Sequence, residues 1–130
     1  MFDRTNWIRP VFIVAGIYDA VLGIAFLVGA ERIFSAFAVT PPNHLAYVEF
    51  PALLLLVFAA MFFRIARDPA KFRDLMPYGM GLKLSYSALA FWYQSTSDIA
   101  TMWIPWAWID LVFFILFLIA WRVTSEIRGT

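Results

Sequence analysis

The 130-residue sequence contains no cysteine, one histidine and only 15% charged residues, whereas ordinary soluble domains contain about 25%. The missing thiols exclude a disulfide scaffold and a thiolate-ligated metal site. Ten Lys or Arg against nine Asp or Glu give a formal net charge of +1, so the basic surface that binds nucleic acid is also missing. Because 63% of the residues are hydrophobic, intrinsic disorder is excluded as well. The class that remains is an integral membrane protein, with membrane lipid as its first partner and no nucleic acid.

Four apolar segments are long enough to cross a membrane as helices. A spanning helix needs about 20 mostly apolar residues, and the candidate segments cover residues 11–29, 45–63, 76–93 and 102–121. Between the first two, the amphipathic residues 31–37 are expected to lie along the membrane surface. Since the four segments use most of the chain, we predict a single domain over residues 1–130, an all-α integral membrane four-helix bundle.

The basic residues predict how the bundle is oriented, because cytoplasmic loops carry an excess of Lys and Arg. Eight basic residues lie on one side of the predicted spans: Arg4, Arg9, Arg64, Arg67, Lys71, Arg73, Arg122 and Arg128. The other side has Arg32 alone. We therefore expect a multi-pass protein of the inner membrane with both termini cytoplasmic. The first segment has the basic start of a signal peptide, but its apolar run is long and contains Asp19, so we expect a retained helix.

Each predicted span contains one ionisable residue away from its ends, namely Asp19, Glu49, Lys83 and Asp110. With a rise of about 1.5 Å per residue, the two aspartates and the lysine lie within roughly 2 Å of the middle of their helices. Glu49 lies about 7 Å nearer the outer side. A charge at the bilayer centre costs about 2.5–3.5 kcal/mol, so these side chains should face the bundle interior. The simplest arrangement places Lys83 between Asp19 and Asp110, with the glutamate above them.

Small residues flank two of these charges at helical spacing. The two runs, each spaced by four, are Ala15, Asp19, Gly23 and Gly79, Lys83, Ser87. Small side chains let helices approach closely in a membrane. The spacing therefore predicts that Asp19 and Lys83 each lie on a helix face that packs against another helix.

The four intramembrane ionisable residues do not balance in charge. If all are ionised, three negative charges face one positive charge, and two uncompensated negative charges are not stable in a low dielectric. Either one or two of the carboxyls hold a proton, or a cation or cationic ligand lies among them. We therefore take Asp19, Glu49, Lys83 and Asp110 as candidate ligand- or proton-binding residues. The alternative, in which Lys83 bridges one aspartate and only fixes the helix register, stays open.

No motif for a metal, a cofactor or a known catalytic apparatus is present. His44 and Glu49 alone are too few ligands for a metal ion, and a single histidine excludes bis-histidine haem ligation within the chain. The sequence has no Walker loop, dinucleotide fingerprint, HExxH motif or nucleophile elbow. We therefore expect no metal and no cofactor, and we name no catalytic residue.

Several short motifs together resemble those of a known group of proteins. They are Tyr18-Asp19 and Gly23 in the first span, Pro42-Asn43 before the second, Ala66-Arg67-Asp68-Pro69 after it, Gly79, Gly81 and Lys83 in the third span, and Asp110-Leu111 in the fourth. With them the chain resembles, over nearly its whole length, a widespread group of small bacterial four-span membrane proteins with Gly and Lys in the third helix and Asp in the fourth. The resemblance implies the fold and one recurring constellation of two aspartates and a lysine. It implies no function, because that group has no established activity.

Three functions are compatible with these features. The first is a non-enzymatic accessory or interaction subunit of a larger membrane assembly, or a homo-oligomer, because the short loops leave little for soluble chemistry. The second is a proton- or cation-coupled carrier of a small solute, with Asp19 and Asp110 as titrating sites. The third is a membrane enzyme or binding protein for a lipophilic ligand, with Asp110 or Glu49 as general acid and Lys83 stabilising an anion. A dry, packed cluster favours the first, a cavity reaching one or both membrane faces the second, and an apolar pocket against a carboxylate the third.

Overall fold

The computed structural model describes residues 5–127, with side chains up to residue 125, and over this range it contains helices and no strands. The helices are α1 (Ile8–Ala36), α2 (Ala46–Arg67), α3 (Met76–Thr96) and α4 (Ile104–Ile127), with short 3-10 turns η1 (Arg73–Leu75) and η2 (Thr101–Trp103) before α3 and α4. Each helix coincides with one of the four apolar segments of the sequence. The prediction of an all-α, four-helix chain is therefore confirmed.

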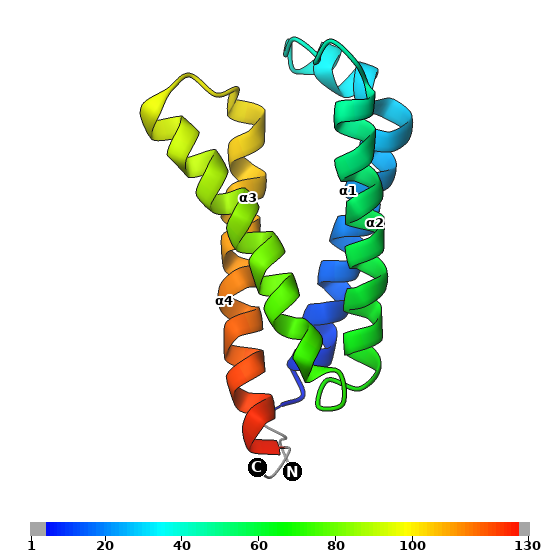
Figure 1. Ribbon diagram of the computed structural model, residues 1–130, viewed down its shortest axis with the longest axis vertical. Helices are drawn as coiled ribbons and strands as arrows, with labels where there is room; N and C mark the ends of the chain where they lie inside the picture. The colour runs from blue at the N-terminus through cyan, green and yellow to red at the C-terminus, as the bar shows by residue number, and fades with distance from the viewer. Residues whose placement is uncertain (1–4, 128–130) are drawn as a thin grey trace.

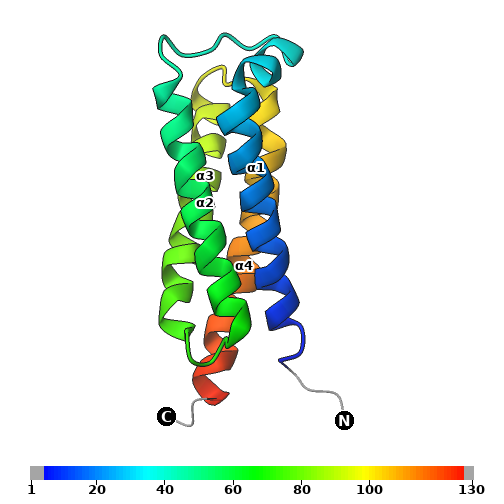
Figure 2. The same cartoon turned by 90° about the vertical axis from the view of Figure 1, so that its right-hand side faces the viewer.

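The four helices form two antiparallel hairpins, α1–α2 and α3–α4 (Figure 1). The two helices of each hairpin lie side by side along most of their length, as both views show (Figures 1 and 2). The hairpins meet closely at the end where α1 begins and α4 ends, and they diverge toward the α1–α2 and α3–α4 connections (Figure 1). This divergence leaves room between the hairpins at one end of the bundle.

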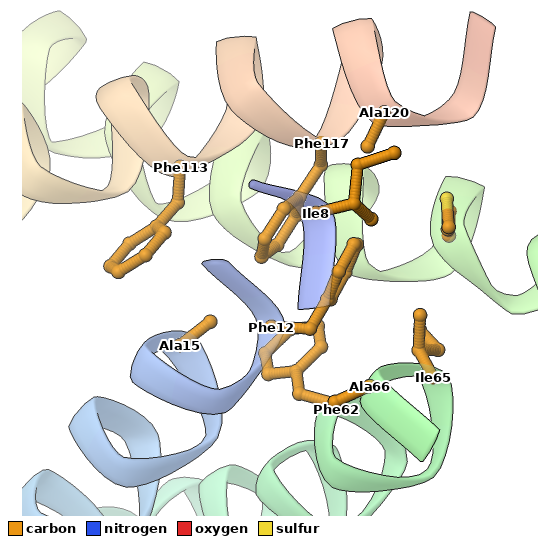
Figure 3. Close-up of a cluster of buried hydrophobic side chains, with 10 residues drawn as sticks. Ile8, Phe12, Ala15, Phe62, Ile65, Ala66, Phe113, Phe117 and Ala120 are labelled. Carbon is orange, nitrogen blue, oxygen red and sulfur yellow. The ribbon is translucent and has the colours of Figure 1, made fainter. Parts of the chain in front are cut away.

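Aromatic side chains hold the hairpins together at the end where they meet. The rings of Phe12 and Phe117 stack with their centroids 4.5 Å apart, and the Phe62 centroid lies 5.1 Å from that of Phe117 (Figure 3). These rings come from α1, α4 and α2, and Met76 joins the same buried cluster from α3. Since all four helices contribute to it, this cluster is the hydrophobic core of the bundle and closes that end.

The small residues lie where helices pack most closely, as their spacing predicts. Both runs of small and charged residues, Ala15, Asp19, Gly23 and Gly79, Lys83, Ser87, are buried. At Gly23, an added Cβ atom would stand 2.8 Å from the backbone carbonyl oxygen of Ala52 on α2. At Gly79, it would stand 2.6 Å from the ring of Phe62. The glycines therefore let α1 approach α2, and let α3 approach α2 beside the hydrophobic core.

Helix α1 extends beyond the predicted end of the first span at residue 29. The backbone at Gly29 is not helical (φ −130°, ψ 22°), and the helix bends there and continues to Ala36. Residues 31–37, expected as a separate amphipathic segment, are therefore mostly the last turns of α1. The helix ends in a Schellman motif, in which the amide of Val39 donates to the carbonyl of Phe34 (2.8 Å) and the amide of Ala38 to that of Ser35 (3.2 Å).

Three of the helical segments are long and apolar enough to cross a membrane: Ile8–Ala36, Ala46–Arg67 and Thr101–Ser125. The exception is α3, which has 21 residues and is therefore long enough, but is less apolar. Its sequence contains Lys83 together with several serine and tyrosine residues. A helix of this kind is most stable when its polar face meets other helices rather than lipid.

Candidate functional site

A buried ion cluster connects the two hairpins. The Lys83 Nζ lies 2.7 Å from Oδ1 of Asp19 and 3.2 Å from Oδ1 of Asp110. The three residues come from α3, α1 and α4, and their exposed fractions are 1%, 0% and 8%. The arrangement predicted from the sequence, with Lys83 between the two aspartates, is therefore confirmed. The pair with Asp19 crosses from one hairpin to the other, whereas the pair with Asp110 lies within the α3–α4 hairpin.

Aromatic rings surround the ammonium group of Lys83 on its remaining sides. Its Nζ lies 5.0 Å from the centroid of the Tyr18 ring, 5.1 Å from that of Phe113 and 5.7 Å from that of Phe62. The faces of aromatic rings attract cations at such distances. Two carboxylates and three rings therefore contact the ammonium group and hold it between the two hairpins.

Glu49, the fourth residue predicted for the site, does not join the cluster. It is half-buried in the first turn of α2, and within the described part of the chain Lys83 pairs only with Asp19 and Asp110. The expected ratio of three acids to one base therefore becomes two carboxylates to one ammonium. If all three are ionised, the cluster carries one uncompensated negative charge.

A cavity of about 640 Å³ lies between the diverging hairpins and ends at this cluster. Residues of all four helices line it, and the only charged ones within residues 5–127 are Asp19 and Asp110. At the opposite end the cavity is lined by Phe34 of α1, Val39 after α1 and Trp103 of η2, which belong to a second apolar cluster, and by the exposed Thr40. The cavity is of the size and apolar character of sites that enclose small organic ligands.

Aromatic contacts join α1 to η2 and α4 along one side of the cavity. The rings of Phe26 and Trp103 stack with centroids 5.8 Å apart, and those of Tyr18 and Trp106 lie 6.2 Å apart. Beside the Lys83 ammonium, the ring of Tyr18 also contacts that of Phe113, with a centroid distance of 5.7 Å. These pairs extend along α1 from Tyr18, beside the charge cluster, to Phe26, and they pack α1 against η2 and α4 on this side.

The exposed residues of the lining lie mainly on α2, which points to a mouth of the cavity between α2 and α3. The lining residues Tyr47 and Leu54 of α2 are 68% and 39% exposed, whereas α3 contributes only Leu82 and Tyr86 to the lining. Pro51 also lines this side and has no amide hydrogen, so the carbonyl of Tyr47 lacks the helical hydrogen bond it would otherwise accept. Because these residues follow one another along α2, we infer an opening on the side of the bundle that runs parallel to the helix axes.

Two buried polar atoms at the cluster have no hydrogen-bond partner: the hydroxyl of Tyr18 and the Oδ2 of Asp19. Both residues line the cavity. Other buried polar groups nearby are paired, since the hydroxyl of Tyr86 donates to the carbonyl of Trp103 (2.7 Å) and that of Ser87 to the carbonyl of Ala107 (2.9 Å). An unpaired buried polar atom costs about 1–3 kcal/mol, so a polar ligand group that pairs with these two atoms would gain that free energy.

Basic residues gather at the other end of the bundle. A smaller hollow of about 350 Å³ is lined by Arg64, Arg67, Asp68, Lys71 and Phe72, at the turn between α2 and α3. The guanidinium of Arg64 lies 4.8 Å from the centroid of the Phe72 ring, and the ammonium of Lys71 lies 5.3 Å from it. This end is the one that the distribution of Lys and Arg predicts to be cytoplasmic.

The residues that the sequence suggested less strongly have structural roles or lie in the cavity wall. The Nδ1 of His44 accepts a hydrogen bond from the amide of Ala46 (3.0 Å), and among the described residues no group of three His, Cys, Asp or Glu side chains could hold a metal ion. Sequence reasoning did not include Tyr86 and Trp106 in the site. Their spacing could have indicated them, because Tyr86 follows Lys83 by three residues and Trp106 precedes Asp110 by four. Residues at these spacings lie on the same face of a helix.

Comparison of the chain with protein-family models, with curated proteins and with solved structures gave no match. The resemblance to small four-span bacterial membrane proteins therefore stays a prediction. Function is inferred here from the geometry of the cavity and its charge cluster.

Proposed function

We propose that this chain is an inner-membrane protein with cytoplasmic termini that binds a lipophilic small molecule in the cavity between its hairpins. The apolar part of the ligand lies between α2 and α4, and its polar end meets Asp19, Asp110 and Tyr18. The proposal is one of binding, and it assigns no chemical step to these residues.

The observation that carries the proposal is the position of the two aspartates at the closed end of an apolar cavity. An apolar cavity provides affinity for a hydrophobic molecule, and a few polar groups at one end fix its orientation. Here Asp19 and Asp110 are such groups, and the unpaired hydroxyl of Tyr18 is a third. A cluster whose only task is to fix the helix register needs no cavity beside it.

The two other functions expected from the sequence fit the structure less well. A carrier needs a path from its site to the opposite face, but the rings of Phe12, Phe62 and Phe117 fill the bundle beyond the charge cluster. An accessory subunit is expected to have a dry, packed cluster, whereas both aspartates of this one line a cavity. Apolar side chains such as Val21 and Val28 are exposed on α1, and they suit lipid as well as another subunit.

The sideways mouth supports a ligand that is dissolved in the membrane. The exposed residues beside it, Tyr47 and Leu54, are apolar or amphipathic, and in a bilayer they would face lipid. A hydrophobic molecule that partitions into the membrane would then reach the cavity between α2 and α3 without crossing water. The basic end at Arg64, Arg67 and Lys71 supports the cytoplasmic side assigned to both termini.

Photolabelling tests the proposal. The protein is placed in phosphatidylcholine nanodiscs with dodecanol that carries a diazirine in its alkyl chain, and labelled residues are mapped by peptide mass spectrometry after irradiation. Labelling at exposed residues such as Val21 and Val28 reports contact with the bulk membrane. We expect labelling in excess of that reference at the cavity residues of α2 and α3.

A matched pair of variants shows whether that labelling depends on the cavity. Leu55→Trp places a large ring in the cavity, whereas Leu53→Trp makes the same change two residues away, at an exposed position of α2 that does not line it. We expect Leu55→Trp to reduce cavity labelling to the bulk reference and Leu53→Trp to leave it unchanged. Equal labelling of the cavity in both variants would show that the ligand does not lie there.

A further inference from the structure

We propose that the ligand of this cavity is an amphiphilic organic cation, a long-chain molecule whose protonated amine lies against Asp19, Asp110 and Tyr18. This inference rests on the proposed function and adds the chemical class of the ligand's polar end.

The first argument is charge. Lys83 compensates one of the two aspartates that it contacts, and within the described chain no second cation pairs with either of them. When both aspartates are ionised, the excess charge lies at the end of an apolar cavity, where an ion is poorly solvated and an unpaired carboxylate is therefore costly. A single positive charge on the ligand would restore the balance. A second carboxylate, as in a fatty acid, would increase the excess.

The second argument is hydrogen bonding. The unpaired Oδ2 of a carboxylate is an acceptor, and the unpaired Tyr18 hydroxyl also has acceptor capacity. Their common partner must therefore be a donor, and an ammonium group has three N–H donors and no acceptor. An alcohol can also pair with both atoms, by donating to Oδ2 and accepting from the Tyr18 hydroxyl, whereas a carboxylate has no donor for Oδ2. The two unpaired atoms thus favour a hydrogen-bond donor over a carboxylate, and the charge balance then favours an amine over an alcohol.

The third argument is the surface that the rest of the polar end would contact. The wall of the cavity includes the rings of Tyr18, Tyr86 and Trp106 as well as aliphatic side chains. Aromatic faces attract organic cations. The alternative of a bound metal ion is disfavoured, because the described residues offer no set of three acidic or imidazole ligands and hard cations need about six oxygen ligands.

The experiment compares three dodecyl probes that carry the same diazirine and differ only in the polar end: an amine, an alcohol and a carboxylic acid. Each is added to the full-length protein in phosphatidylcholine nanodiscs, and cavity labelling is divided by labelling at the exposed face of α1 to correct for partitioning. We expect this ratio to be about tenfold higher for the amine than for the alcohol, as one added ion pair of about 1.4 kcal/mol gives. We expect the acid to give the lowest ratio.

Two variants locate the preference. Asp110→Asn keeps the size and a hydrogen-bond acceptor for Lys83 but removes the excess charge, so the amine and the alcohol should then label equally. Asp98→Asn removes an exposed carboxylate that does not line the cavity, and it should leave the preference unchanged. Thermal unfolding of both variants establishes that they are folded.

The outcomes separate the two proposals. Labelling of the cavity by the alcohol as strongly as by the amine in the wild-type protein, or more strongly by the acid, would overturn the cationic ligand and leave the lipophilic site standing. Labelling of the cavity by none of the three probes above the bulk reference would overturn both. An amine preference that survives Asp110→Asn would show that the aspartate cluster is not its cause, and would also overturn the inference.

Discussion

The ammonium of Lys83 and the carboxylate of Asp19 form an ion pair, 2.7 Å between Nζ and Oδ1, that joins one helical hairpin to the other. It lies between the aromatic core, where the hairpins pack, and the cavity, where they diverge. The same pair therefore contributes to the assembly of the bundle and forms the closed end of the candidate binding site. Substitutions at these two residues should lower the stability of the bundle, and this loss should in turn weaken ligand binding.

We predict that Lys83→Met destabilises the bundle by about 3–5 kcal/mol, because it leaves two carboxylates buried without their cation. Thermal or denaturant unfolding in detergent micelles measures the loss. The double variant Asp19→Asn with Lys83→Met should recover about 0.5–3 kcal/mol relative to the single variant, since it removes one of the unpaired charges. Wild-type stability of Lys83→Met would show that the ion pair does not hold the hairpins together.

We predict that Gly23→Ala destabilises the α1–α2 hairpin by about 1–3 kcal/mol. The added methyl group would stand 2.8 Å from the backbone carbonyl oxygen of Ala52, so the helices must move apart. Gly81→Ala is the matched control, because a Cβ atom there has no neighbour within 4 Å. At that exposed helical position the change should stabilise the protein by about 0.5–1 kcal/mol. Unfolding measurements that rank the two variants in the opposite order would contradict the close packing of α1 on α2.

We predict that Ala38→Gly stabilises the protein by about 0.5–1 kcal/mol. Ala38 is the one non-glycine residue with positive φ among those described (φ 55°), and a left-handed conformation is unfavourable for alanine. Glycine relieves that strain and loses part of the gain through the freedom of the unfolded chain. Ala60→Gly, in the exposed middle of α2, should instead destabilise by a similar amount. If both changes lower the unfolding temperature equally, α1 does not end in the Schellman motif described above.

The absence of native cysteine makes the proposed orientation easy to measure. A single cysteine at Ser97→Cys, in the α3–α4 connection, should react with a membrane-impermeant maleimide on intact spheroplasts. Ala70→Cys, in the α2–α3 turn, should react only after the membrane is permeabilised, because the basic end is predicted to be cytoplasmic. The reverse pattern would invert the topology and place the mouth of the cavity near the inner side of the membrane.

Much of this architecture was predictable from the sequence. The length of the apolar segments gives the helices, and the spacing of Ala15, Asp19 and Gly23 by four residues gives the buried face of α1. The cost of a charge in lipid is what predicts that Lys83 lies between two aspartates. These features follow from local periodicity or from the cost of a charge in lipid. Both can be recognised in a single sequence.

The cavity was not predictable from the same reasoning. It exists because the hairpins pack closely at Phe12, Phe62 and Phe117 and diverge beyond them, and the angle between two hairpins depends on contacts between distant segments. Glu49 was grouped with the other three charges because each predicted span contains one ionisable residue, although it was expected about 7 Å nearer the outer side. In the structure Glu49 is half-buried in the first turn of α2, and among the described residues the ion pairs of Lys83 are with Asp19 and Asp110.

The most direct test of the account is an experimental structure of the protein in lipid with dodecylamine added, at a resolution that shows single side chains. The account predicts an elongated molecule in the cavity between α2 and α4, with its nitrogen at hydrogen-bonding distance, about 2.7–3.2 Å, from Asp19 or Asp110. Hairpins that close on each other and fill the cavity with their own side chains would contradict it. A cavity occupied only by acyl chains, with no polar group at the aspartates, would contradict it as well.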